Sequence, residues 1–311
     1  MTDLNEIGFE ITENDGQSVE TLEDCPSPPP PFHRAKMPLV QPPMIFNDHN
    51  STITVQNIVP FDNIFFNDAK TYLFETTNAS SIVNESTTQK STPSFFQRFL
   101  SFFRPSTNRP FDQQCEQLLN LTKHPCLMSD RIHLRILYTI YRRLTNSREI
   151  FYQTFGPHWE QIGFQSSNPE TDFRSTGLFS IFYLLYFVDS MYLPLARQIY
   201  EFSHDEHQQF PFACVGINLA NVLIKHLRQH SSREKLRKLT GETLAIDLGG
   251  KLFIALYLNF YLIWKEHAYT IVNSQQVLTE LEQILTRRSN VLFERFDQYF
   301  RRKTNGDNQT F

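Results

Sequence analysis

From residue 112 onward, the apolar positions repeat with the period of an α-helix. In residues 131–145, isoleucine and leucine recur at four-residue steps, which places them on one helical face. Residues 212–228 and 277–299 repeat this one-sided pattern, and charged side chains occupy the opposite side. No alternating strand pattern of useful length appears in this part of the chain, so the sequence predicts helices without a sheet.

Two stretches are apolar almost all round, Thr176 to Asp189 and Leu244 to Trp264. A helix without a polar face must be covered on every side, so we expect both to be central. Their uninterrupted apolar runs stop at Asp189 and Lys265 after about a dozen residues, whereas a membrane span needs ~20. We therefore predict an all-α domain over residues 112–303, with amphipathic helices around two central apolar helices.

Residues 1–91 differ in composition from the rest of the chain. The first 90 residues hold 13 Asp or Glu and 4 Lys or Arg, a charge of about −9, so the remainder carries about +5 by difference from the net charge of −4. Their apolar patches are too short to offset the entropy of ordering, which predicts a disordered acidic tail. Within it, the proline run 28–31 is either an extended linker or a polyproline ligand.

A short basic and aromatic segment, residues 92–106, follows this tail. The spacing of its phenylalanines puts them on one side of an amphipathic helix, with Arg98 and Arg104 beside them. This pattern is typical of a weak contact with a membrane surface, and docking onto the neighbouring domain is the alternative. The phenylalanines concerned are Phe95, Phe96, Phe99, Phe102 and Phe103.

The remaining composition indicates a reduced, cytoplasmic protein without a metal site. The four cysteines lack metal or redox spacing: Cys25, Cys115, Cys126 and Cys214. No apolar run with a basic flank opens the chain, so we expect a cytoplasmic protein, peripheral on an organelle membrane if residues 92–106 contact lipid. The basic stretches 228–238 and 295–303 lack a stacking platform for bases, and the chain is acidic overall, so we expect no nucleic-acid partner.

One arginine stands at an unusual position, before the first central helix. Thr171 or Asp172 could cap that helix, which would place Arg174 in its first turn. A cation there faces the positive end of the helix dipole, at a cost of roughly 0.3–1 kcal/mol. Arg174 either reaches a nearby carboxylate, such as Glu160, Glu170 or Asp172, or projects outward as a fixed cation for an anionic ligand.

The stretch "HWEQIGFQSSNPETDFRSTGLFSIFYLLYF" resembles the signature of the ELMO domain. That signature reads approximately Trp-x3-Gly-Phe-Gln-x3-Pro-x-Thr-Asp-x-Arg-Gly-x-Gly and precedes an apolar helix. The resemblance extends over about residues 112–300 and leaves the tail unmatched. The matching residues are Trp159, Gly163, Phe164, Gln165, Pro169, Thr171, Asp172, Arg174 and Gly177.

The resemblance implies a GTPase-activating protein for small GTPases of the Arf and Arl families. The arginine that matches Arg174 is the proposed catalytic finger, since a guanidinium supplied in trans neutralises charge on the transferring phosphoryl group. The activator itself would need no cofactor, because GTP and magnesium belong to the partner. The implied alternative is a non-catalytic scaffold that binds a small GTPase or a Dock-type exchange factor.

Two residues of the motif leave this implication open. Gln165 either positions the attacking water or binds loop backbone. Ser175 stands where most of the family has glycine, and a backbone torsion or close approach that requires glycine would weaken the site.

Overall fold

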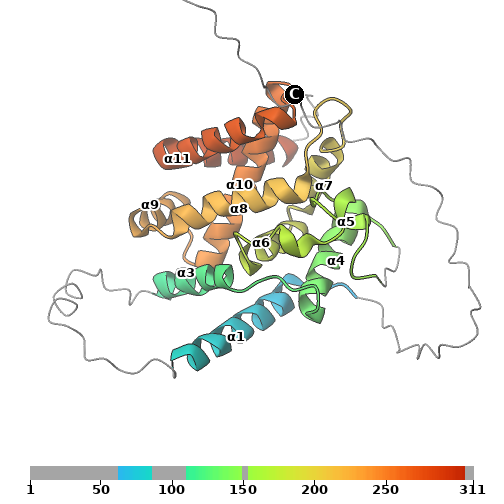
Figure 1. The fold of residues 1–311 in the computed structure, drawn as a ribbon. Helices are drawn as coiled ribbons and strands as arrows, with labels where there is room; N and C mark the ends of the chain where they lie inside the picture. The colour runs from blue at the N-terminus through green and yellow to red at the C-terminus, as the bar shows by residue number, and fades with distance from the viewer. Residues whose placement is uncertain (1–61, 86–109, 149–152, 305–311) are drawn as a thin grey trace, which may run out of the picture. The chain divides into compact units, whose positions relative to one another are not determined.

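The computed structural model describes residues 62–85, 110–148 and 153–304, and every regular element among them is a helix (Figure 1). This confirms the all-α prediction. In chain order the α-helices are α1 (Phe66–Glu85), α3 (Pro110–Asn120), α4 (Arg131–Thr145), α5 (His158–Gln161), α6 (Leu178–Val188), α7 (Leu193–Phe202), α8 (Phe212–Leu227), α9 (His230–Thr240), α10 (Ala245–Glu266) and α11 (Ser274–Thr304). Three short 3₁₀ helices join them: η1 (Leu121–Lys123), η2 (Pro169–Thr171) and η3 (Ile271–Asn273).

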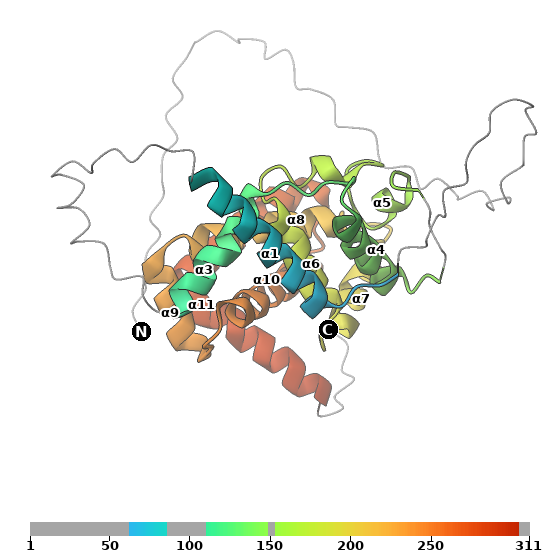
Figure 2. The same ribbon diagram turned by 90° about the horizontal axis from the view of Figure 1, so that it is seen from below.

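The two apolar helices predicted to be central are α6 and α10. Every residue of α6 except Tyr186 is buried, and α10 is buried without interruption from Leu252 to Tyr261. The amphipathic helices α4 and α8 turn their apolar faces toward α6, and α11 packs along α10. Figure 2 shows α1 beside α6 and α3 beside α10 on the remaining side. A fully buried Leu or Phe contributes roughly 1.5–3 kcal/mol, so these two helices form the main core.

Two glycines let α10 approach α6 closely. A Cβ on Gly249 would lie 2.0 Å from the hydroxyl oxygen of Tyr183, and one on Gly250 would lie 2.3 Å from Cε1 of Tyr186. The "DLGGKL" stretch is therefore a notch that receives two aromatic rings of α6, inside a continuous helix.

By length and composition, α10 is the one helix in the described ranges that could cross a membrane. However, 78% of its most apolar window is buried inside the structure. The helices packed against it, α3, α8 and α11 among them, cover this apolar surface. Burial in the bundle thus accounts for its composition, as expected of a core helix.

The prediction of a disordered tail that extends to residue 91 is wrong for residues 62–85. Ile64, Ala69 and Leu73 are buried, and the Phe66 ring lies 4.8 Å from that of Phe182 in α6. The Phe66 amide also donates to Asp189 Oδ2 at 2.8 Å. A single apolar stripe on α1 is enough to pack onto a core that other helices supply, although the segment is polar on average. The proline run and residues 92–106 lie outside the described residues.

We predict that α1 contributes to the stability of the bundle. Deleting residues 1–91 in place of residues 1–61 additionally removes Ile64, Phe66 and Leu73, so the free energy of unfolding should fall by about 3–5 kcal/mol between the two truncations. Urea denaturation followed by circular dichroism would measure this difference. Phe66→Ala in the full chain should shift stability in the same direction, and equal stability of the two truncations would contradict the prediction.

Candidate functional site

The loop from Trp159 to Gly177 carries the predicted motif, and buried aromatic side chains hold its first half. Trp159 is fully buried, and its Nε1 donates to the carbonyl oxygen of Thr154 at 2.9 Å. Phe164 packs edge-on against Trp159 and Phe173, with ring centroids 6.3 and 5.5 Å apart. These rings fasten the loop to the core.

Gly163 lets the loop cap the N-terminus of α8. Its φ is 91°, and a Cβ at this position would lie 2.3 Å from the backbone nitrogen of Phe212. Because the approach is this close, the carbonyls of Ile162 and Gly163 accept hydrogen bonds from Ala213 N and Cys214 N at 3.0 and 3.1 Å. The first amides of a helix have no partner inside it, so the motif loop satisfies two donors of α8.

Asp172 closes the second half of the loop. Its Oδ2 accepts a hydrogen bond from the Gln165 amide at 2.9 Å, and its Oδ1 accepts one from the Thr171 hydroxyl at 3.3 Å. Pro169 begins η2, and Asn168 caps it. The backbone of Gln165 makes the bond to Asp172 while its side chain is exposed, so a role for that side chain in placing water stays a prediction.

The expectation that Thr171 or Asp172 caps the first central helix is wrong. Residues 172–177 form a turn, and α6 begins only at Leu178. The Gly177 amide donates to the Phe173 carbonyl at 2.7 Å, and Gly177 has φ 54° and ψ −140°, which are not helical values. The turn therefore stands apart from the helix, and Arg174 lies in this turn and not in the first turn of α6.

Gly177 also brings a distant segment to this turn. The Leu178 amide donates to the carbonyl of His124 at 3.0 Å, and a Cβ on Gly177 would lie 2.5 Å from that same oxygen. Only glycine fits both the left-handed φ and the close approach. The segment that follows η1 is thereby fixed beside the Arg174 turn.

Arg174 is exposed and makes no hydrogen bond or ion pair with any residue that the structure describes. Asp172 binds the loop backbone instead, and neither Glu160 nor Glu170 pairs with the guanidinium. The first interpretation of Arg174, an ion pair with a carboxylate of its own loop, is therefore not observed among the described residues. The observed arrangement is that of an outward-facing cation.

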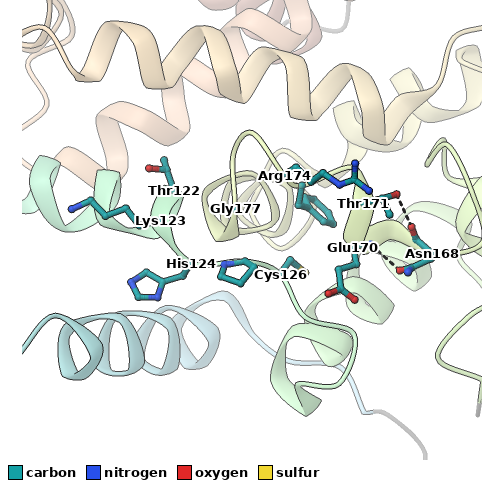
Figure 3. A pocket seen from close by; sticks show the side chains of 11 residues that line it. Thr122, Lys123, His124, Cys126, Asn168, Glu170, Thr171, Arg174 and Gly177 are labelled. Carbon is teal, nitrogen blue, oxygen red and sulfur yellow. Dashed lines mark hydrogen bonds between the residues drawn. The ribbon is translucent and has the colours of Figure 1, made fainter. Parts of the chain in front are cut away.

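A surface pocket of about 480 Å³ lies between the Arg174 turn and the segment around η1 (Figure 3). Arg174 and Glu170 line one side, and Lys123 and His124 line the other, with Gly177 between them. No sequence pattern pointed to Lys123 and His124, because their place beside Arg174 depends on the Leu178–His124 hydrogen bond. The long separation along the chain hides this contact.

Burial disfavours the thiolate form of the two cysteines near this site. Burial raises the pKa of Cys126, which lines the pocket. Burial, with a smaller effect of the Asp172 carboxylate, raises the pKa of Cys214 to about 12. Both thiols are therefore protonated near neutral pH, and the thiolate is the reactive form. Burial and Lys123 lower the pKa of His124, so this ring is mostly uncharged near neutral pH.

Ser175 fits its position without strain. Non-glycine residues with positive φ in the described ranges are Asn146 and Ala268, so Ser175 does not need the torsion that favours glycine. Its side chain is exposed, and its hydroxyl accepts a hydrogen bond from Asn221 Nδ2 of α8 at 3.1 Å. The serine thus adds a link between the Arg174 turn and α8.

Comparison with known proteins agrees with the motif. The model of the ELMO/CED-12 family matches residues 116–278, which include the whole loop from Trp159 to Gly177. Comparison with solved structures gives no significant match.

Several curated relatives are similar to this chain. ELMO domain-containing protein 3 of Homo sapiens is 32% identical over 211 residues, which cover 67% of this chain and 54% of the relative. The Mus musculus protein of the same name is 30% identical over the same shares. ELMO domain-containing protein 2 of Homo sapiens is 25% identical over 47% of this chain and 50% of the relative. The chain therefore spans about half the length of the curated relatives it matches.

We predict that Gly177→Ala destabilises the domain more than Gly241→Ala does. Both glycines have positive φ, but a Cβ on Gly241 meets nothing within 4 Å, whereas one on Gly177 meets backbone oxygen. The torsion alone should cost about 1–2 kcal/mol at either position, and the clash should add about 1–3 kcal/mol at Gly177. Urea denaturation would measure both losses, and equal losses would show that the contact with His124 is unimportant.

Proposed function

The chain belongs to the ELMO/CED-12 family, and on this basis we propose that it stimulates GTP hydrolysis by a small GTPase of the Arf or Arl families. Arg174 is the residue supplied in trans. The observation that carries the proposal is an exposed guanidinium without a described partner, on a turn fixed at both ends. The rate enhancement would come from the partner's own active site, completed by this side chain.

The attachment of the turn supports this role. Asp172 binds Gln165 before the arginine, and the Leu178–His124 bond follows it. Ser175 adds the bond from α8. A charge that is fixed in advance stabilises a transition state better than one that must be ordered during reaction.

The chemistry of phosphoryl transfer suits an arginine at this position. Negative charge is spread over the oxygens of the transferring group, and a guanidinium can contact two of them at once. An inserted arginine increases hydrolysis by about 10³- to 10⁵-fold in GTPases that use one.

The proposal assigns the remaining chemistry to the partner. GTP and magnesium belong to the GTPase, and the activator contributes protein groups alone. We place this reaction in the cytoplasm, at the surface of an organelle membrane if residues 92–106 contact lipid.

The non-catalytic scaffold, which binds a small GTPase or a Dock-type exchange factor without accelerating hydrolysis, depended on Ser175. The unstrained backbone and the bond from Asn221 give that alternative no support. Catalysis is therefore the function that we propose.

We predict that Arg174→Ala lowers stimulated hydrolysis by at least about 10³-fold on a responsive Arf or Arl protein, and that Arg174→Lys recovers little, since the planar fork is lost. Single-turnover GTP hydrolysis across a panel of these GTPases would measure this. Ser175→Gly removes the bond from Asn221 but keeps Arg174, so it should lower the rate far less than Arg174→Ala does.

Arg174 is exposed, so Arg174→Ala and Arg174→Lys should be as stable as the wild type. An alanine variant as active as wild type would rule out the finger. A wild type that binds GTPases without stimulating any of them, with or without Ser175→Gly, would instead favour the scaffold.

A further inference from the structure

One strip of α8, partly buried at its start and exposed at its far end, begins at the Arg174 turn. Cys214, at the start of the strip, lies with its sulfur 3.9 Å from Asp172 Oδ2. Asn221, further along, donates to Ser175, the residue after Arg174. The strip is therefore joined to the turn at two points, and Figure 1 shows α8 running from there across the bundle toward α9.

The strip is polar along its length and basic at its far end, where Lys225 and Arg228 lie. Its residues recur at steps of three and four, which places them on one face of α8, while the other faces of the helix are buried. From the motif end to the far end, these residues are Cys214, Asn218, Asn221, Lys225 and Arg228. At 1.5 Å per residue the strip is roughly 20 Å long.

Further cations lie where the strip ends. The hydroxyl of Thr286 in α11 forms a hydrogen bond with His226 Nε2 of α8 at 3.1 Å. The carbonyl of Thr286 accepts one from Lys235 Nζ of α9 at 3.4 Å. Arg287 and Arg288 follow Thr286 and are exposed, and α11 departs from helical geometry at Arg288, with φ −138° and ψ 47°. The C-terminus of α8, α9 and this break in α11 therefore meet around one residue.

Positive charge exceeds negative charge on this surface. Glu282 is paired with Lys225 at 2.8 Å, and Glu234 of α9 is held by Arg237 at 3.0 Å. Arg228, Arg287 and Arg288 form no ion pair with residues in the described ranges. An excess of positive charge attracts a negatively charged surface and increases the rate of association.

A single inserted arginine cannot hold a partner in place. Specific protein interfaces bury about 1,200–2,000 Å² in total, far more than one side chain supplies. The surface that meets the partner beside the finger must extend from the Arg174 turn. The α8 strip is fixed to that turn by hydrogen bonds from Cys214 and Asn221, so it is a surface that adjoins the finger.

We propose that the partner GTPase docks an acidic face along this strip, and that Arg228 is a main determinant of its affinity. This rests on the proposed function, since it takes the partner to be the GTPase that receives Arg174. Arg228 acts on binding, because it lies at the end of α8 opposite to Cys214, whereas Arg174 acts on the rate.

The test is Arg228→Glu in the full chain, with stimulated hydrolysis measured over a range of activator concentrations. The half-maximal concentration should rise about tenfold or more, as expected when a charge pair at an interface becomes repulsive, while the maximal rate changes less than about threefold. Arg228→Lys should restore most of the affinity. Arg174→Ala should instead lower the maximal rate and leave the half-maximal concentration nearly unchanged.

Lys70→Glu on α1 is the charge-matched control and should leave both parameters unchanged. If Arg228→Glu behaves like this control, the docking proposal is overturned. It is also overturned if Arg228→Glu weakens binding to phosphatidylserine vesicles but not to the GTPase, because the strip would then serve a lipid surface. Thermal unfolding of each variant confirms that it is folded.

Direct binding to GTP-loaded GTPases separates this proposal from the catalytic one. A wild type that binds without stimulating, and whose binding Arg228→Glu abolishes, would support docking while excluding the finger. Stimulation that depends on Arg174 but not on Arg228 would do the reverse. A wild type that binds no GTPase would overturn both.

Discussion

The hydrogen bond from the Leu178 amide to the His124 carbonyl is the contact on which the site depends. It forms at the start of α6, a helix buried on nearly every side, so its position is set by the core. Gly177 makes the contact sterically accessible by having no Cβ. The Arg174 turn is therefore attached directly to the buried core of the bundle, and catalysis requires a side chain that is held in one place.

The same loop also completes the bundle. Its carbonyls at Ile162 and Gly163 satisfy amides at the start of α8, while Trp159 fills space in the core. Removing the loop would leave the first amides of α8 without hydrogen-bond partners. The same contacts therefore stabilise both the fold and the site. Asn221 of α8 in turn donates a hydrogen bond to Ser175, so α8 and the loop contact each other at both places.

Periodicity in the sequence was sufficient to predict the main helices of the core, because their burial is a property of each segment. The uniform apolarity of α6 and α10 and the one-sided pattern of α4 and α8 each follow from local composition. The start of α6 could not be predicted, since it depends on an acceptor at His124 far along the chain. The packing of α1 was missed for a related reason: Leu73 is buried and Phe66 packs on Phe182 of α6, and both contacts involve residues that are distant in sequence.

Most residues of the motif hold the loop in place, whereas the side chains of Arg174 and Gln165 are exposed. Trp159, Gly163, Asp172 and Gly177 each serve a contact inside the domain, while Arg174 serves none that the structure describes. Selection for a stable fold therefore preserves the motif whatever happens at position 174. A descendant could exchange that one codon, keep every other letter of the signature and remain well folded, so inheritance of the signature and inheritance of the chemistry are separate events.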